Sequence, residues 1–234
     1  MMIDPAAGLE SAREGAERSR RAGFPWAEAF SYSFEGLLLV IGNDDIAAEA
    51  SFRRALEIQQ QLVDHEGAGL SLGGLAQLAA RRGDHAAAVD LYQQSLTAFE
   101  AIGDRAEEAR ILSEMAWVEL ASGQPFEARG HFLESVDRYT DVASGRGVGL
   151  SLVGLAATAA AEGRNLAAAQ IAAGAEVYAH EEGIVNVYGE DASGWELIER
   201  AREALTDEER ALAADAGRAL TIRELLELGS AAGG

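Results

Sequence analysis

The sequence predicts an all-α fold, a right-handed solenoid of helical hairpins, and two observations carry this prediction. The first is a period of 40 positions, seen in an aromatic series (Phe52, Tyr92, Phe132) and a small-residue series (Ala48, Ala88, Ala128, Ala168). A period in this range marks an array of repeated helical units. The second is composition: hydrophobic residues make up 48% of the chain and aromatics only 6%, which suits closely packed helices better than a sheet.

The array begins with an incomplete repeat. Residues 5–22 carry the small-residue pattern of a second helix, so they are expected to be the back half of a truncated unit. The first full unit follows, with one apparent extra residue in its turn, which predicts that its first helix slips by one position. Pro5 and Pro125 stand where helices begin. Glycines mark the helix ends about one repeat apart, at Gly42, Gly83, Gly123 and Gly163.

The later repeats show apolar stripes at helical spacing. In the second unit Leu72, Leu75 and Ala79 lie at i, i+3 and i+7, and equivalent stripes follow in the third and fourth units. The segment 69–76 recurs almost intact as segment 149–156. The chain is therefore internally duplicated, and residues 1–183 are predicted to be one array of a half repeat plus four repeats.

The pattern stops after Gly183, and residues 184–234 are predicted to form a C-terminal helical cap and tail. Residues 184–192 look like an irregular link, and three helices are expected near 193–205, 207–217 and 222–228. Two of them open with capping boxes, Thr206 with Glu209 and Thr221 with Glu224. A repeat array needs such an end to cover its last apolar face.

The net charge of the chain argues against two classes of binding partner. The formal net charge is −20, which repels phosphate backbones and anionic lipid, so direct nucleic-acid binding and membrane binding are not expected. The most basic stretch, Arg13 to Arg21, is interleaved with glutamates and indicates a solvated helix face with internal ion pairs. The first apolar run, Leu37 to Ile41, is too short to span a bilayer, so a cytoplasmic protein is expected.

No residue set predicts catalysis. The chain has no Lys and no Cys, which removes Schiff-base, phosphate-loop and thiolate chemistry. Gly69 to Gly73 matches G-x-S-x-G, but it lies inside a helical segment and is better explained by packing. The four His residues lack metal-ligand spacing. We therefore predict a protein that is not an enzyme, with no catalytic residue, metal or cofactor.

The second helices carry a family pattern. Gly83-Asp84, Ala88, Tyr92 and Ser95 place small and aromatic residues at the offsets of the tetratricopeptide repeat, and Gly123, Ala128, Phe132 and Ser135 repeat them. The chain resembles that family, with 40 residues per unit rather than about 34. The longer unit is similar to the repeat region of LuxR-type and maltose-activator-like bacterial signal-transduction ATPase regulators. The segment 216–228 looks like the one that closes those arrays.

This resemblance implies a protein- or peptide-binding module in bacterial signalling or transcriptional regulation. First helices line the concave groove of tetratricopeptide arrays. Subtracting packing positions from them leaves eleven residues, and six of these are the candidate groove residues: Gln77, Arg81, Arg110, Ser113, Trp117 and Val153. Arg81, Arg110 and Trp117 would suit an acidic or C-terminal peptide group. Burial of Trp117 against a neighbouring helix is the alternative. The alternative function is a structural homo-oligomerisation unit, in which the N-terminal edge pairs with a second copy as a homodimer.

Overall fold

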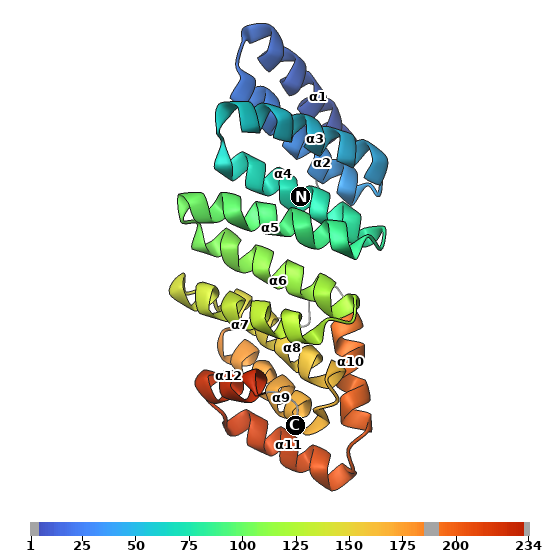
Figure 1. Ribbon diagram of the computed structural model, residues 1–234, viewed down its shortest axis with the longest axis vertical. Helices are drawn as coiled ribbons and strands as arrows, with labels where there is room; N and C mark the ends of the chain where they lie inside the picture. Colours follow the sequence, from blue (N-terminus) through green and yellow to red (C-terminus); the bar gives the residue numbers. More distant parts are fainter. Residues whose placement is uncertain (1–4, 185–191, 232–234) are drawn as a thin grey trace. The chain divides into compact units, whose positions relative to one another are not determined.

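A computed structural model describes residues 5–184 and 192–231. These residues form twelve α-helices and no β-strand (Figure 1). Spatial contacts divide the chain into two compact units, Met1–Asp104 and Arg105–Gly234. The predicted all-α helical-repeat class is confirmed, because consecutive helices pack as antiparallel pairs within each unit.

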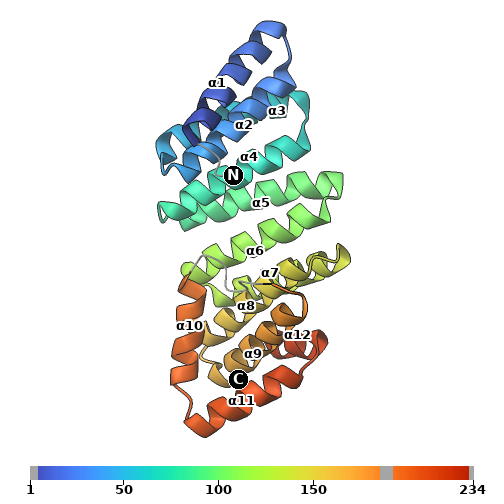
Figure 2. The same cartoon turned by 180° about the vertical axis from the view of Figure 1, so that it is seen from behind.

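Unit 1 holds the truncated repeat and the first two full repeats. Its helices are α1 (Pro5–Ala22), α2 (Pro25–Ile41), α3 (Asp45–Leu62), α4 (His65–Arg81) and α5 (His85–Ile102). Each helix packs on the next, and the first helices α2 and α4 also contact each other (Figures 1 and 2). Helix α1 has the bounds predicted for the half repeat.

Unit 2 holds two further repeats and the C-terminal helices. The repeats comprise α6 (Arg105–Ala121), α7 (Pro125–Asp141), α8 (Gly145–Ala161) and α9 (Asn165–Glu181). After them come α10 (Ala192–Glu203), α11 (Asp207–Ala219) and α12 (Ile222–Ser230), close to the predicted helices. Most of the expected link 184–192 lies outside the described residues. Helix α11 packs on α9, as the first helix of a further repeat would, whereas α10 packs on both α8 and α9.

Every turn between successive helices from α1 to α9, and the end of α9, uses one backbone device. A residue with positive φ follows each helix at intervals of 20 positions: Gly23, Asn43, Val63, Gly83, Gly103, Gly123, Ala143, Gly163 and Gly183. The next residue closes the old helix and often opens the new one. Asp84, for example, donates its N–H to the Ala79 carbonyl at 3.0 Å, and its side chain accepts from the Ala87 N–H at 3.2 Å. This shared cap fixes the length of each helical unit.

The predicted slip of the first helix by one position is wrong. Helices α2, α4, α6 and α8 begin 40 residues apart, at Pro25, His65, Arg105 and Gly145. In the first repeat the left-handed position belongs to Asn43, with φ 58°, and not to Gly42, with φ −77°. Asparagine tolerates this conformation better than other non-glycine residues, so the turn keeps its length without the expected glycine.

The recurrent seam of Ala and aromatic residues forms the core, as predicted. Phe52 is 1% exposed, and the Ala series at 48, 88, 128 and 168 is fully buried. The Phe52 ring lies between two glycines of neighbouring first helices. A Cβ added at Gly36 would come within 2.8 Å of the ring, and one at Gly74 within 2.6 Å. Glycine is needed at these positions because the backbone approaches an aromatic ring directly.

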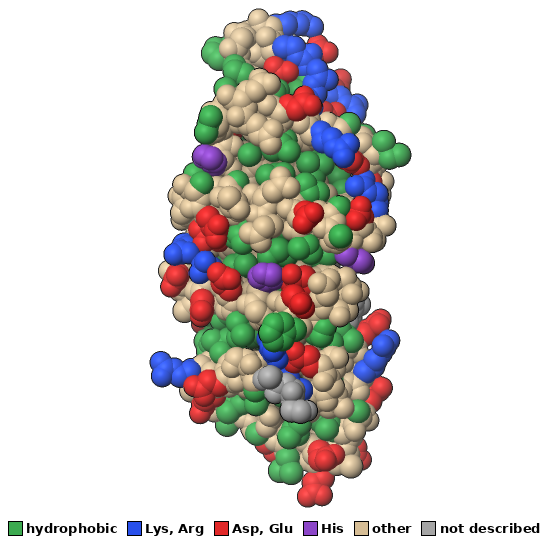
Figure 3. Space-filling view, viewed as in Figure 1, with side chains coloured by type: hydrophobic (Ala, Val, Ile, Leu, Met, Phe, Trp, Pro, Cys, Tyr) green, Lys and Arg blue, Asp and Glu red, His purple; other side chains and the backbone are tan. Residues whose placement is uncertain are grey.

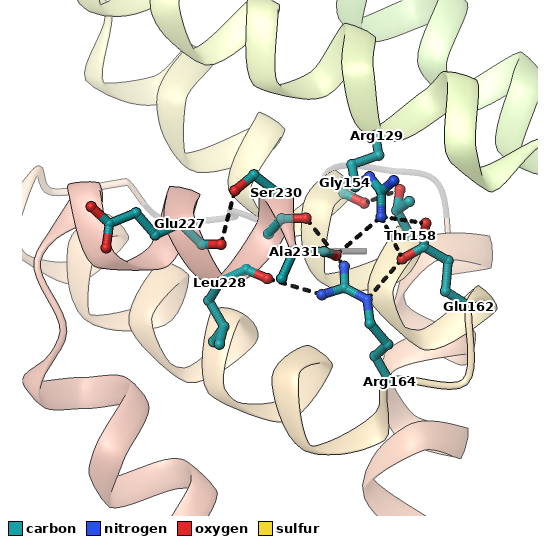
Figure 4. Close-up of polar contacts among 10 residues, drawn as sticks. Arg129, Gly154, Thr158, Glu162, Arg164, Glu227, Leu228, Ser230 and Ala231 are labelled. Atoms are coloured by element: carbon teal, nitrogen blue, oxygen red, sulfur yellow. Dashed lines mark hydrogen bonds and ion pairs between the residues drawn. The ribbon is translucent and has the colours of Figure 1, made fainter. Parts of the chain in front are cut away.

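The C-terminal helix is held by two arginines on its last carbonyls (Figure 4). Arg164 donates to the Leu228 carbonyl at 2.9 Å and to the Gly229 carbonyl at 3.1 Å, and Arg129 donates to Ala231 at 3.1 Å. Glu162 bridges the two guanidinium groups, at 3.0 Å from Arg129 and 2.8 Å from Arg164. Cations at a helix C-terminus satisfy its free carbonyls and complement its dipole, so this cluster fixes α12 on unit 2.

Candidate protein-binding surface

Within each unit, the first helices share one set of equivalent repeat positions, which we name the first-helix face of that unit. In α2 these positions are Phe30, Ser33, Leu37 and Ile41. Because the helices share a 40-residue register, the equivalent positions follow directly in the later repeats. They are Leu70, Gly73, Gln77 and Arg81 in α4; Arg110, Ser113, Trp117 and Ala121 in α6; and Leu150, Val153, Ala157 and Ala161 in α8. The six predicted groove residues hold such positions, two of them in unit 1 and four in unit 2.

Two of the six belong to unit 1. Gln77 and Arg81 are exposed on α4. The Arg81 guanidinium donates to Asn43 Oδ1 at 2.8 Å and lies 3.2 Å from Asp45 Oδ1, so the preceding turn already neutralises its charge. Gln77 presents an uncharged amide beside it.

Arg110, in unit 2, is held between two carboxylates of its own helix. Its Nη2 lies 2.6 Å from Glu107 and its Nη1 lies 2.7 Å from Glu114. Burial alone would lower the pKa of Arg110, but these carboxylates raise it above its usual value. An acidic peptide group would therefore compete with two carboxylates that are already in place.

Of the other three predicted residues, Trp117 is partly buried, and Ser113 and Val153 are buried. The Trp117 ring packs edge-on against Phe132, with centroids 5.1 Å apart, and a Cβ at Gly194 of α10 would overlap the Trp117 ring. Ser113 is 9% exposed and Val153 only 2%. In unit 2, then, helix α10 occupies part of the first-helix face, and it crosses the direction of the repeat helices (Figures 1 and 2).

Helix α2 exposes a row of apolar side chains that were not among the predicted residues. Five large apolar side chains follow one stripe of this helix: Trp26, Phe30, Phe34, Leu37 and Ile41. Their exposed fractions are 61%, 59%, 43%, 51% and 69% in that order. We name this row the α2 ridge. The sequence prediction considered outward positions only in the later repeats, so it missed the ridge. Extending the 40-residue period back to α2 would have found it.

The charges around the ridge are paired away from it. The only charged residues of α2 are Glu28 and Glu35, and both bind arginines of α1: Arg20 at 2.8 Å and Arg13 at 2.7 Å. Figure 3 shows the basic side chains of α1 interleaved with acidic ones, in line with the ion pairs expected for this stretch. The α2 ridge itself carries no charge.

The G-x-S-x-G segment has the packing role that its position predicted. Ser71 is fully buried in α4, where its Oγ donates to Gln59 Oε1 at 2.8 Å and lies 3.1 Å from Ser33 Oγ. Gln59 Nε2 in turn donates to Ser33 Oγ at 3.0 Å. These bonds tie α2, α3 and α4 together and satisfy the polar groups that burial would otherwise leave unpaired.

Within residues 5–184 and 192–231, no three His, Asp or Glu side chains come together in a way that could hold a metal ion. Over the same ranges, each helix is too short or too polar to cross a bilayer.

Comparisons with known proteins agree with this architecture. The fold defines a helical-repeat protein, and residues 43–101 match the tetratricopeptide repeat model. The crystal structure of BtubC (BKLC) from P. vanneervenii is similar, with a TM-score of 0.70 at 17% sequence identity. The alignment covers 97% of this chain and 93% of that one. At this identity the likeness shows the fold alone. No curated protein matches the sequence.

Proposed function

We propose that this protein is a non-enzymatic module that holds a protein or peptide segment on its first-helix face. Tetratricopeptide repeats generally mediate protein–protein interactions and are generally non-catalytic. The observation that carries the proposal is the exposed α2 ridge, because soluble monomers rarely leave a row of large apolar side chains in water unless the row binds something.

The rest of the first-helix face contributes unequally to this proposal. Gln77 and Arg81 supply accessible polar contacts in unit 1, while Arg110 and Trp117 form the corresponding part of unit 2. Ser113 and Val153 support the face from below. The setting in bacterial signalling or transcriptional regulation, in the cytoplasm, rests on the sequence resemblance and forms part of the proposal.

A site-specific crosslinking experiment tests the face. A photoreactive amino acid replaces Gln77 on α4, or Gln93 on α5 as the matched control, since both are exposed glutamines of the same repeat. After irradiation in the native cell extract, a crosslinked partner is expected from position 77 only. Equal crosslinking from both positions, or none from position 77, would remove the support for a first-helix binding face.

A further inference from the structure

We propose that the α2 ridge binds an amphipathic helix from a partner protein, with an apolar face of small and aliphatic residues and a basic polar face. This inference deepens the proposed function and rests on it. It commits to unit 1 because the equivalent face of unit 2 is already partly occupied by a helix of this chain, α10.

Helix α10 shows what chemistry this face accepts. Its Gly194 sits directly against Trp117, the position equivalent to Leu37 of the ridge. Its Ile198 is fully buried and its Ala201 is 4% exposed, both in the same hydrophobic cluster as Trp117. A small residue that admits an aromatic ring, followed by aliphatic residues at helical spacing, is therefore an occupant that already fits the first-helix face.

The size of the ridge favours a single helix over a second copy of the chain. With aromatic side chains contributing about 150–250 Å² each when fully exposed, the five half-exposed residues present roughly 500 Å² of apolar surface. A standard stable interface buries about 800 Å² on each partner. The ridge is one helix long, which matches the footprint of one helix laid along or across it.

The net charge of the protein favours a bound helix with a basic polar face. The ridge is uncharged, because Glu28 and Glu35 are held by arginines of α1. The chain as a whole carries a net charge of −20, so its long-range field attracts basic partners and repels a second copy. Lysine or arginine on the solvent side of the bound helix would therefore speed association and strengthen binding at low salt.

The probe is a fluorescein-labelled peptide with the sequence of residues 192–205, in which Glu196→Lys, Glu199→Lys and Glu203→Lys supply the basic face. Fluorescence anisotropy with the full chain is expected to give saturable binding that weakens as salt rises. The double variant Phe30→Gln with Leu37→Gln should bind at least tenfold more weakly. The matched control is Ile46→Gln with Leu212→Gln, which removes two exposed aliphatic side chains that are not part of the ridge and should leave the affinity unchanged.

Circular dichroism shows whether the ridge variant folds. A native helical spectrum is expected, because the substituted side chains are exposed. Three results would overturn the inference: equal affinity of the ridge variant and the native chain, tighter binding of the unsubstituted acidic peptide, or a concentration-dependent dimer in sedimentation that the ridge variant abolishes. If position 77 still crosslinks to a partner, any of these results leaves the proposed function standing while rejecting a basic helix as the ligand.

Discussion

Replacing Gly74 with Ala tests the packing on which the repeat stack depends. The new Cβ would lie 2.6 Å from the Phe52 ring, whereas ordinary van der Waals contacts begin near 3.4 Å. The ring must therefore move by about 0.8 Å, the difference between these distances. It has little room, since Phe52 is 1% exposed and its ring also lies against Gly36, where an added Cβ would be 2.8 Å away.

The expected cost follows from two opposing effects. Overpacking a well-filled core costs about 1–3 kcal/mol, while replacing Gly by Ala inside a helix gains about 1 kcal/mol of propensity. We therefore expect Gly74→Ala to lower the free energy of unfolding by up to about 2 kcal/mol. Urea denaturation followed by circular dichroism at 222 nm measures this difference.

Gly130→Ala is the control, because Gly130 is an exposed helical glycine of α7 with nothing within 4 Å of its added Cβ. It should raise the unfolding free energy by about 0.5–1 kcal/mol through propensity alone. Combining Gly74→Ala with Phe52→Leu should recover part of the loss, since a smaller side chain leaves room for the methyl group. If Gly74→Ala stabilised the protein as much as Gly130→Ala, the proposed contact between α4 and Phe52 would be incorrect.

Three further changes probe the turns, the pH dependence and the cap. Val63→Gly should raise the stability by about 0.5–1 kcal/mol in thermal melts. A β-branched residue at φ 55° loses about 1–2 kcal/mol, and glycine regains this only in part. Gly83→Val should have the opposite effect in the same measurement. The hydrogen bond to Glu119 raises the pKa of His131 from 6.5, although burial opposes it. The stability that this pair contributes is thus complete below pH 6.5 and disappears as pH rises through the raised pKa, so the deficit of Glu119→Gln should shrink as pH rises above 6.5. Arg164→Ala removes two donors from the α12 carbonyls and should speed amide exchange in α12 by about tenfold or more, while exchange in α6 stays unchanged.

The helices could be predicted because stacked repeats need the same residue types at equivalent positions of every unit. Each second helix needs the same small residue at one place, so the Ala series at 48, 88, 128 and 168 survives in the sequence and gives the period. The 20-residue spacing of the turns was harder to see. Its left-handed positions include Asn43, Val63 and Ala143, and Val and Ala give no turn signal. Surrounding helices hold these residues in a conformation that their own preferences oppose.

The environment of a candidate surface residue could be predicted only where the residues that contact it lie close to it in the sequence. Glu107 and Glu114 lie three positions before Arg110 and four after it, a spacing at which helical side chains meet, so the neutralisation of this arginine is visible in the sequence. Trp117 is different. Its covering residue, Gly194, belongs to a helix outside the repeat pattern, and no periodicity connects the two. Burial by such a segment can be found only from the folded chain.

A repeat array constrains its packing positions in every unit but leaves its outward positions free to differ. Position 48 and its equivalents all hold Ala, whereas the outward position 30 and its equivalents hold Phe, Leu, Arg and Leu. Solvent favours polar residues at exposed positions, as at Gln77, so a helix that exposes five large apolar side chains departs from what folding requires. Its own charged residues are also turned toward α1, which keeps the ridge apolar along its length. The ion pairs with α1 account for the placement of these charges, whereas packing within unit 1 does not account for the exposed apolar row, which the proposed helical partner would cover.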